Sequence, residues 1–327
     1  MIAVDAMGGD HAPEEVVEGA VLAASEVKRS IMLVGDLSKI DRLLPKPCPT
    51  RIELHPASQV IEMHEKPVEA LRRKKDSSLV VAANLVRDGV AQAMVSAGNT
   101  GAATAASVLA WRQAPGVHRP AIASLMPNRG DGFVLLDAGA SPDVDPEHLV
   151  EFGKLGRAYA STVMGRSNPK VHLLNIGEED SKGNAFTKQA FGLLSQYDWF
   201  AGNIEGKDMF FKNCDVVVCD AFVGNIVLKT AEGVAEFFME LMREQVPSNP
   251  VAKIPFLPLR KLVSALKKKG DYAEVGGSPL LGLNGICVIA HGRSNARAIK
   301  NAIRLADRAI EGGLVTKIRE SFEGDKG

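Results

Sequence analysis

The sequence predicts an α/β fold with three layers, in which a mostly parallel mixed sheet lies between helices. Apolar strand-like runs alternate with amphipathic helical patterns almost throughout the 327 residues, as expected of a largely parallel sheet covered on both faces. The polar loop Met126–Gly132 joins two strand-like runs directly, which predicts a hairpin and makes the sheet mixed. No repeat or low-complexity linker divides the chain. We therefore expect a single domain over residues 1–327, from which the amphipathic segment 245–270 protrudes.

The first element is a strand that leads through a glycine turn into a helix. Ile2–Val4 is a short β-prone run, and Asp5 stands where that strand would reach the edge of the sheet. Gly8 and Gly9 permit a sharp turn and the close approach of a ligand, because no Cβ blocks it. Pro13–Glu15 is typical of a first helical turn. The turn therefore predicts an anion site; the alternative is a tight connection with a hydrogen-bonded aspartate and a surface histidine.

The later elements follow in the same alternation. Further strands are predicted at Ile31–Gly35, Ile52–His55, Ala93–Ser96, Ala121–Met126, Phe133–Asp137, Val171–Ile176, Trp199–Asn203, Val216–Asp220 and Ile286–His291. The clearest amphipathic helices are predicted at Pro146–Val163, Thr187–Gln196, Ile226–Arg243 and Ala296–Glu311. A further helix-rich stretch is expected to extend through Leu85.

Composition indicates a globular protein of the cytoplasm. Lys and Arg together number 39, as do Asp and Glu, so no overall field marks a nucleic-acid binder. The four cysteines show no CxxC spacing, which favours a reduced chain. We expect no signal peptide, and no apolar stretch approaches the roughly 18 residues that span a bilayer. The chain is expected to be soluble or at most to lie on a membrane surface.

Four further loops at the ends of predicted strands combine glycine with polar side chains. They are Ser96–Gly101 with Asn99 and Thr100, Gly177–Asn184 with Lys182, Asp220–Asn225 with Asn225 at an expected helix N-cap, and His291–Ser294 with Arg293 available to an anion. Ligands of open α/β sheets bind at the carboxyl ends of strands. Taken singly, these residues could be caps, a solvated lysine, a strand-end histidine or a surface ion pair. Their recurrence favours a site for phosphate and a developing oxyanion.

Signatures of other site classes are absent from the sequence. It contains no GxGxxG after a strand, no GxxxxGK[ST], no GxSxG and no HExxH. Four aspartates could in principle hold a divalent ion: Asp5, Asp10, Asp137 and Asp220. We favour structural or orienting roles for them and expect neither a metal nor a cofactor.

Six stretches in order resemble one family across essentially the whole chain. They are Ile2–Pro13, Ser96–Ala102, Gly130–Phe133, Leu174–Asn184, Asp220–Asn225 and Ala290–Gly292. The family is PlsX, the bacterial acyl-ACP:phosphate acyltransferases of phospholipid synthesis. The resemblance implies a fold shared with the isocitrate/isopropylmalate dehydrogenases and similar to phosphotransacetylases. It also implies attack of inorganic phosphate on the thioester of a long-chain acyl-ACP, releasing acyl phosphate and the ACP thiol.

This chemistry suggests roles for the loop residues. We expect Lys182 to be the main electrostatic contact, and Asn225 with backbone N–H groups near Gly183 and Gly224 to donate to the oxyanion or phosphate. His11 and His291 are candidates for protonating the leaving thiolate or orienting phosphate. Asn99 and Thr100 would grip phosphate or pantetheine. The remaining expected binding residues are Asp5, Gly8, Gly9, Asp10, Gly101, Asn184, Asp220 and Arg293.

The segment 251–270 is basic and carries no acidic residue. Pro258 would open a helix in which four apolar residues share one face, namely Leu259, Leu262, Val263 and Leu266. Such a helix predicts peripheral contact with anionic lipid; it could instead pack on a partner subunit or receive acidic ACP. The resemblance implies a homodimer that hands acyl phosphate to a membrane acyltransferase.

Two other function classes remain open on the sequence. One is a metal- and nicotinamide-dependent dehydrogenase of the same fold, which would reduce NAD. The other is a non-catalytic acyl-carrier or membrane scaffold, which would form no acyl phosphate.

Overall fold

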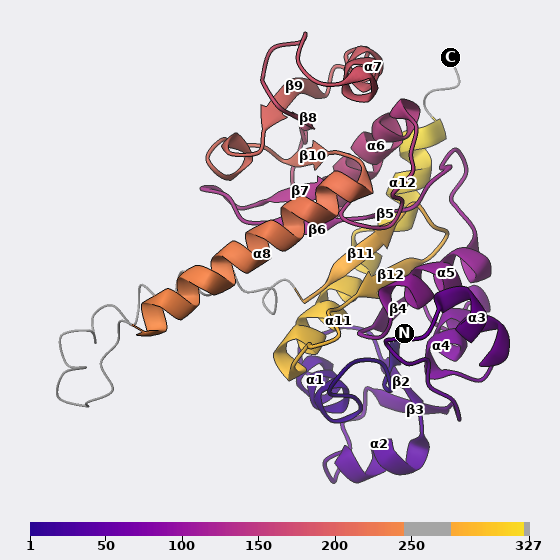
Figure 1. The fold of residues 1–327 in the computed structure, drawn as a ribbon. Coiled ribbons are helices and arrows are strands. Elements are labelled where there is room, and N and C mark those ends of the chain that lie inside the picture. The colour runs from indigo at the N-terminus through magenta and orange to yellow at the C-terminus, as the bar shows by residue number, and fades with distance from the viewer. Residues whose placement is uncertain (245–275, 324–327) are drawn as a thin grey trace.

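The computed structural model describes residues 1–244 and 276–323, and their strands form two sheets. In spatial order, the first sheet comprises β3 (Ile52–Pro56), β2 (Ile31–Gly35), β1 (Ile2–Asp5), β4 (Ala93–Ser96), β12 (Ile286–Ile289), β11 (Ser278–Leu281) and β5 (Ala121–Ile122). The second comprises β6 (Ser124–Met126), β7 (Phe133–Leu136), β10 (Val216–Val218), β8 (Val171–Asn175) and β9 (Phe200–Glu205). Figure 1 shows the second sheet above the first.

Most neighbouring strands run parallel, as the sequence predicts. β1 pairs in parallel with β2 and β4, so that Val4 lies between Leu33 and Val95. β11 is antiparallel to both β12 and β5. The predicted hairpin is confirmed, because β6 and β7 pair antiparallel. The mostly parallel, mixed α/β class is therefore confirmed.

The division into two sheets is not evident from the sequence pattern. The run Ala121–Met126, predicted as one strand, supplies β5 to the first sheet and β6 to the second. It crosses between them at Ala123, whose N–H donates to the carbonyl of Pro279. Apolar periodicity alone cannot show such a crossing, because both halves of the run are buried. β11 was not predicted either; it is short and contains Pro279.

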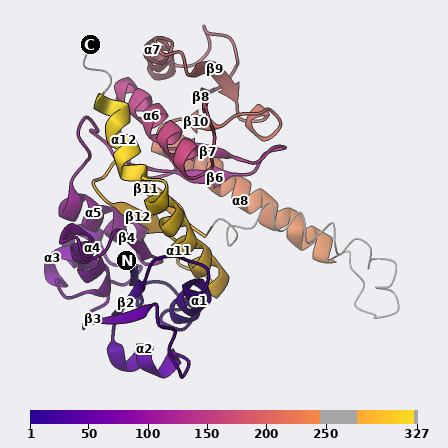
Figure 2. The same ribbon diagram turned by 180° about the vertical axis from the view of Figure 1, so that it is seen from behind.

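Helices cover both faces of the first sheet. One face carries α1 (Glu14–Ala24), α2 (Leu37–Leu43) and α11 (Ala296–Glu311), and the other carries α3 (Pro67–Arg73), α4 (Ser78–Arg87) and α5 (Thr100–Trp111). α1 and α11 lie side by side in the view from behind (Figure 2). Their close approach depends on Gly19, where a Cβ would lie 2.6 Å from Cβ of Ile299. Central strands are buried on both faces, which explains why they are apolar without alternation.

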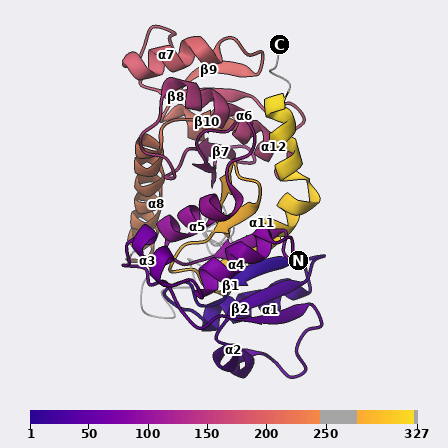
Figure 3. The ribbon, with the colours of Figure 1, turned by 90° about the vertical axis from the view of Figure 1, so that its right-hand side faces the viewer.

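The second sheet also has helices on two sides. α6 (Pro146–Thr162) and α7 (Ala185–Leu194) cover one face, and α12 (Leu314–Glu323) packs against α6. α8 (Ala221–Glu244) packs its inner side on the other face, where Leu228 and Ala231 contact the cluster around Met126 and Phe133. A short 3-10 helix spans Asp208–Phe210. Figure 3 shows α8 and the α11–α12 pair on opposite sides of the molecule.

α8 begins earlier than the sequence predicts and then leaves the body of the molecule (Figure 1). The carboxylate of Asp220 accepts a hydrogen bond from the Val223 N–H at 2.9 Å, which is the pattern of a helix N-cap. Asn225 therefore lies within the helix, and its predicted N-cap position is wrong. The outward part of α8 exposes large apolar side chains, among them Phe237 and Phe238.

Part of the sequence-based interpretation falls on residues that the structure does not describe. The protruding segment 245–270 lies there, with the four apolar residues expected at a membrane: Leu259, Leu262, Val263 and Leu266. Among the described helices, none combines the length and apolar character needed to cross a bilayer.

Candidate functional site

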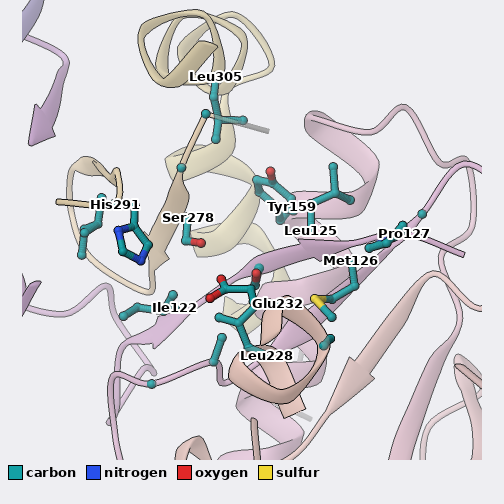
Figure 4. A pocket seen from close by; sticks show the side chains of 18 of the residues that line it. Ile122, Leu125, Met126, Pro127, Tyr159, Leu228, Glu232, Ser278, His291 and Leu305 are labelled. Atoms are coloured by element: carbon teal, nitrogen blue, oxygen red, sulfur yellow. The ribbon is translucent and has the colours of Figure 1, made fainter. Parts of the chain in front are cut away.

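A cavity of about 890 Å³ lies between the two sheets. At one end it is lined by polar groups and backbone from both sheets, including Thr100, Gly139, Asn225 and His291. Its walls are mostly apolar and include Ile122, Leu125, Met126, Tyr159, Leu228 and Leu305 (Figure 4). Polar groups converging at one end of an apolar cavity are typical of a ligand site.

Asp5 organises the loops on the first-sheet side of this cavity. Its buried carboxylate accepts a hydrogen bond from the Ser96 hydroxyl at 2.8 Å, and the same hydroxyl accepts from the Gly98 N–H at 3.1 Å. Burial raises the pKa of Asp5 above its ordinary value, although its hydrogen bonds oppose the rise. Asp5 thus holds the ends of β1 and β4 together rather than facing the cavity.

The glycines after β1 fit a crowded turn. A Cβ on Gly8 would overlap the Asp5 carboxylate and lie 2.9 Å from the Gly98 nitrogen. Gly9 has φ of +118°, a region that favours glycine. The Asp10 N–H donates to the Gly292 carbonyl at 2.8 Å, which ties this turn to the loop after β12. The side chains of Asp10 and His11 are exposed, and within the described chain neither lines the cavity.

The loop after β4 presents Thr100 to the cavity, whereas Asn99 is occupied elsewhere. Asn99 caps α5 by accepting from the Ala102 N–H at 3.0 Å. Its amide nitrogen donates to the carbonyls of Met63 at 2.8 Å and Glu65 at 3.1 Å. Both amide hydrogens are thus used within the protein, so the expected grip on phosphate does not fit this arrangement. Gly101 allows α5 to approach α3, because a Cβ there would lie 2.7 Å from the Pro67 ring.

His291 lines the cavity at the end of the first sheet. The Arg293 N–H donates to its Nδ1 at 3.4 Å, which assigns the proton of the neutral ring to Nε2. Partial burial lowers the pKa of His291, and the charges of Lys229 and Arg293 lower it further. The guanidinium of Arg293 pairs with Glu236 on α8, and both side chains are about half exposed, so its predicted contact with an anion stays a prediction.

Asp137 and Gly224 shape the second-sheet side. The Asp137 carboxylate follows β7 and accepts four backbone N–H groups between 2.8 and 3.0 Å, from Ile122, Gly139, Ala140 and Ser141. A Cβ on Gly224 would overlap the Asp137 carbonyl, so glycine allows α8 to contact this loop. Asn225 follows directly and lines the cavity beside Gly139.

The predicted residues after β8 lie outside the cavity of the described chain. Lys182 is about half exposed, and its Nζ lies 4.0 Å from a Glu179 carboxylate oxygen. Gly183 has φ of +101° and packs on Asn175, and Asn184 caps α7 by accepting from the Thr187 N–H at 2.9 Å. The reason is the strand order: β10 separates β8 from β7, so the end of β8 is farther from the first sheet.

Lys229 is a cation at this site that the sequence analysis missed. It lies one turn after Asn225 on α8 and lines the same cavity. Its Nζ lies 2.8 Å from a Glu232 carboxylate oxygen, and its charge acts on His291. The signal was available, because residues four apart on a helix share a face, but α8 was treated as an amphipathic surface helix. No grouping of three or more potential metal-ligating His, Cys, Asp or Glu side chains occurs among the described residues.

Sequence comparison gives a consistent family assignment. Residues 1–317 match the model of a family described as "Fatty acid synthesis protein". A phosphate acyltransferase of Desulfitobacterium hafniense is 47% identical over 324 residues, which are 98% of this chain and 97% of that protein. A phosphate acyltransferase of Geobacter sulfurreducens is 46% identical over 325 residues, covering 98% of this chain and 94% of that protein.

Solved structures share the fold at low sequence identity. A phosphotransacetylase from Streptococcus pyogenes aligns with a TM-score of 0.63 and 17% identity, covering 95% of this chain and 94% of that one. A 4-hydroxythreonine-4-phosphate dehydrogenase from Klebsiella pneumoniae aligns with a TM-score of 0.54 and 14% identity, covering 94% and 98%. At such identities the likeness concerns the fold alone.

Proposed function

This chain belongs to the PlsX family of phosphate acyltransferases, and we propose that it transfers a long-chain fatty acyl group from acyl-ACP to inorganic phosphate. The enzyme is an acyltransferase, and phosphate and an acyl donor are its substrates. The proposed product is acyl phosphate for phospholipid synthesis. The observation that carries the proposal is the cavity, which joins polar groups of both sheets at one end to apolar walls.

The polar end suits attack by phosphate on a thioester. Phosphate is already anionic at neutral pH, so positioning and charge stabilisation matter more than a buried base. The Thr100 hydroxyl and the N–H groups of Thr100 and Gly101 can hold phosphate oxygens, whereas the Ala102 N–H is already bound to Asn99. A phosphate oxygen then bonds to the acyl carbon, and the carbonyl oxygen becomes an oxyanion near the Asn225 amide.

Collapse of this intermediate breaks the carbon–sulfur bond and releases the ACP thiolate, which takes up a proton. His291 supports this step by donating a hydrogen bond from Nε2 of its neutral ring to the phosphate or to the departing sulfur, while the proton that the thiolate takes up comes from water. Lys229 supplies positive charge beside the anionic reactants. We propose Lys229, in place of Lys182, as the main electrostatic contact. His11, Asp10, Gly183 and Asn184 remain predicted contributors without a place on the cavity wall of the described chain.

The direct experiment is to incubate purified protein with long-chain acyl-ACP and phosphate. Acyl phosphate is trapped with hydroxylamine, and free ACP thiol is titrated in parallel. We expect both products in equal amounts, and neither without phosphate. Thiol release without acyl phosphate would identify a thioesterase and contradict the proposal. The same preparation tested for reduction of NAD examines the dehydrogenase alternative, and absence of acyl phosphate together with retained acyl-ACP binding would support a scaffold.

We also propose that the protein forms a homodimer through the outer face of α8. Val223, Ile226, Val234, Phe237 and Leu241 share that face, and all five are exposed. At 100° per residue, this face is opposite the one that carries Leu228 and Glu232 into the cavity. The acidic Glu240 borders it, which disfavours anionic lipid and favours a protein partner. A second copy can supply the same apolar face in a two-fold arrangement.

Two further proposals concern the location of the protein. We propose that it is cytoplasmic and that segment 245–270, outside the described residues, contacts the membrane. We propose that this segment brings a cytoplasmic enzyme to anionic lipid, where a membrane acyltransferase receives acyl phosphate. Its basic residues and the apolar set that includes Leu262 and Leu266 support peripheral binding. Co-sedimentation with anionic vesicles should be lost in Leu262→Glu/Leu266→Glu, while activity on dispersed substrate is retained. Unchanged vesicle binding would contradict the proposal.

A further inference from the structure

The residues that line the cavity differ from one end to the other. Figure 4 shows His291 at one end and Pro127 at the other, with Tyr159, Leu228 and Met126 between them. We infer that the acyl chain lies along the run from Ile122 to Met126 with its methyl end near Met126 and Met164, and that the polar loop beyond this end limits chain length. This inference rests on the proposed function, because it takes the polar end as the place of the thioester.

The walls between the two ends are mostly apolar, and Glu232, which Figure 4 labels there, pairs with Lys229. Ile122, Leu125 and Met126 line one side, and Leu228 and Ala231 of α8 line another. Methionine side chains adapt their shape to flexible apolar ligands at little cost. Burying a methylene group in such a channel contributes about 0.8 kcal/mol, so successive carbons add affinity until the channel ends.

Tyr159 belongs to the apolar wall rather than to the polar end. It is buried beneath α11, and burial raises the pKa of its phenol to about 12. The ring therefore stays neutral at physiological pH and offers its apolar face to the cavity. Leu305 of α11 lies beside it on the same wall (Figure 4).

The run that lines the channel sets the length of chain that can lie along it. Extended backbone advances about 3.3 Å per residue, so the run from Ile122 to Met126 spans at most about 13 Å. An extended alkyl chain advances about 1.25 Å per carbon, because bonds of about 1.5 Å form a zigzag. About 10 carbons of an acyl chain can therefore lie along this stretch of wall.

The far end is bordered by polar groups and open to water, because the Asp131 side chain there is 89% exposed. The Asn128 side chain accepts from the N–H groups of Gly130 and Gly132, both at 2.9 Å, and so fixes the loop between β6 and β7. Arg166 spans this loop, with nitrogens 3.4 Å from carboxylate oxygens of Asp131 and Asp215. Pushing methylene groups against these polar atoms would strip them of water without providing partners, which is unfavourable. The chain length is therefore limited at Met126 and Met164.

Two substitutions should move the limit in opposite directions. Ala231→Leu adds bulk inside the channel on a helix that tolerates leucine, and should favour shorter chains. Met164→Ala enlarges the far end and should favour longer ones. Gly233→Leu is the matched control, because an added Cβ there meets no described atom within 4 Å and Gly233 does not line the cavity.

The readout is kcat/KM for acyl-ACP substrates from octanoyl to stearoyl. We expect the ratio of long-chain to short-chain values to fall at least about tenfold in Ala231→Leu, the usual effect of methylene groups in an apolar pocket. The ratio should rise in Met164→Ala and stay unchanged in Gly233→Leu. A profile that is the same in all three variants, or that shifts equally in the control, would overturn the inference.

A binding measurement separates this inference from the proposed reaction. Alkylphosphonates from octyl to octadecyl carry an anionic head and a saturated tail, so calorimetric titration reports the channel without turnover. If the wild type binds them with affinity that rises with length and the variants shift that dependence, the channel is supported even where no acyl phosphate forms. If acyl phosphate forms but affinity is independent of length, the reaction stands and the channel is wrong.

Discussion

The carboxylate of Asp137 accepts a hydrogen bond from the backbone N–H of Ile122 at 3.0 Å, and this contact joins the two sheets. Ile122 ends β5 in the first sheet, and Asp137 follows β7 in the second. Three more backbone N–H groups bind the same carboxylate, from residues 139 to 141. Because Gly139 lines the cavity, Asp137 fixes the geometry of the site without lining it.

Replacing Asp137 should therefore destabilise the protein strongly. Asp137→Ala leaves four backbone N–H groups at a buried site without their acceptor, and each unsatisfied group costs about 1–3 kcal/mol. Partial rearrangement reduces the sum, so we expect a loss of roughly 3–5 kcal/mol in the free energy of unfolding. Asp137→Asn keeps an oxygen acceptor and should lose less. Denaturant unfolding measures both, with exposed Asp41→Ala as control; a change below about 1 kcal/mol for Asp137→Ala would contradict this role.

Substitution of Lys229 should lower kcat strongly, whereas substitution of Lys182 should not. Lys229 lines the cavity, and Lys182 does not within the described chain. Lys229→Ala should lower kcat about 100-fold, the effect of removing an oxyanion-stabilising group, with little change in stability because the side chain is half exposed. Lys182→Ala should change kcat by less than about threefold. The reverse result would restore Lys182, as the sequence first suggested, and remove Lys229 from the mechanism.

The turn after β1 should not tolerate a side chain. Gly8→Val would push a side chain into the Asp5 carboxylate, and Gly9→Val would force valine to φ of +118°. We expect both variants to lose acyl phosphate formation, because the turn contacts the loops after β4 and β12. Gly206→Val is the control, since an added Cβ there meets no described atom within 4 Å. Full activity of Gly9→Val would show that the turn is only a connection.

The sequence predicted correctly those features that depend on residues close together in the chain. Runs such as Ile2–Val4 and Ile286–Ile289 are buried on both faces and are therefore recognisable from the sequence as central strands. The loop Met126–Gly132 identified the hairpin because turn residues act locally. The glycine turn at Gly8 and Gly9 was found for the same reason. All of these features depend on neighbours within a few residues.

The features that the sequence did not reveal depend on strand order and sheet number. Lys182 and Asn225 both follow strands, but only the strand before Asn225 pairs with β7, so only Asn225 reaches the cavity. Asn99 is of a residue type that often binds ligands, but its amide nitrogen donates hydrogen bonds to the carbonyls of Met63 and Glu65. Lys229 lies on a helix whose inner face is defined by the second sheet. These are consequences of packing between elements distant in the sequence.

The apolar outer face of α8 suggests substitutions that test the proposed dimer. Phe237 is 58% exposed and shares this face with Leu241. Phe237→Glu/Leu241→Glu should convert the dimer to a monomer in analytical ultracentrifugation, because two charges cannot be buried without partners. Gly192→Glu adds a charge at an exposed position of α7, away from α8, and should leave the proposed dimer intact. A wild type that is monomeric at micromolar concentration, or a double variant that remains dimeric, would contradict the prediction.

His291 gives the reaction a predicted dependence on pH. Burial lowers its pKa below the ordinary 6.5, and the charges of Lys229 and Arg293 lower it further, so the neutral ring predominates at pH 7. As the pH falls through this lowered pKa, the ring gains a proton and Nδ1 can no longer accept from the Arg293 N–H. We therefore expect kcat/KM to fall on the acid side with a midpoint below 6.5. Lys229→Met removes the larger of the two charge effects and should move the midpoint upward. Lys182→Met should leave it in place. The profile is measured with saturating phosphate and normalised to each variant's maximum; an acid limb that persists unchanged in His291→Asn or in Lys229→Met would assign the titration to another group.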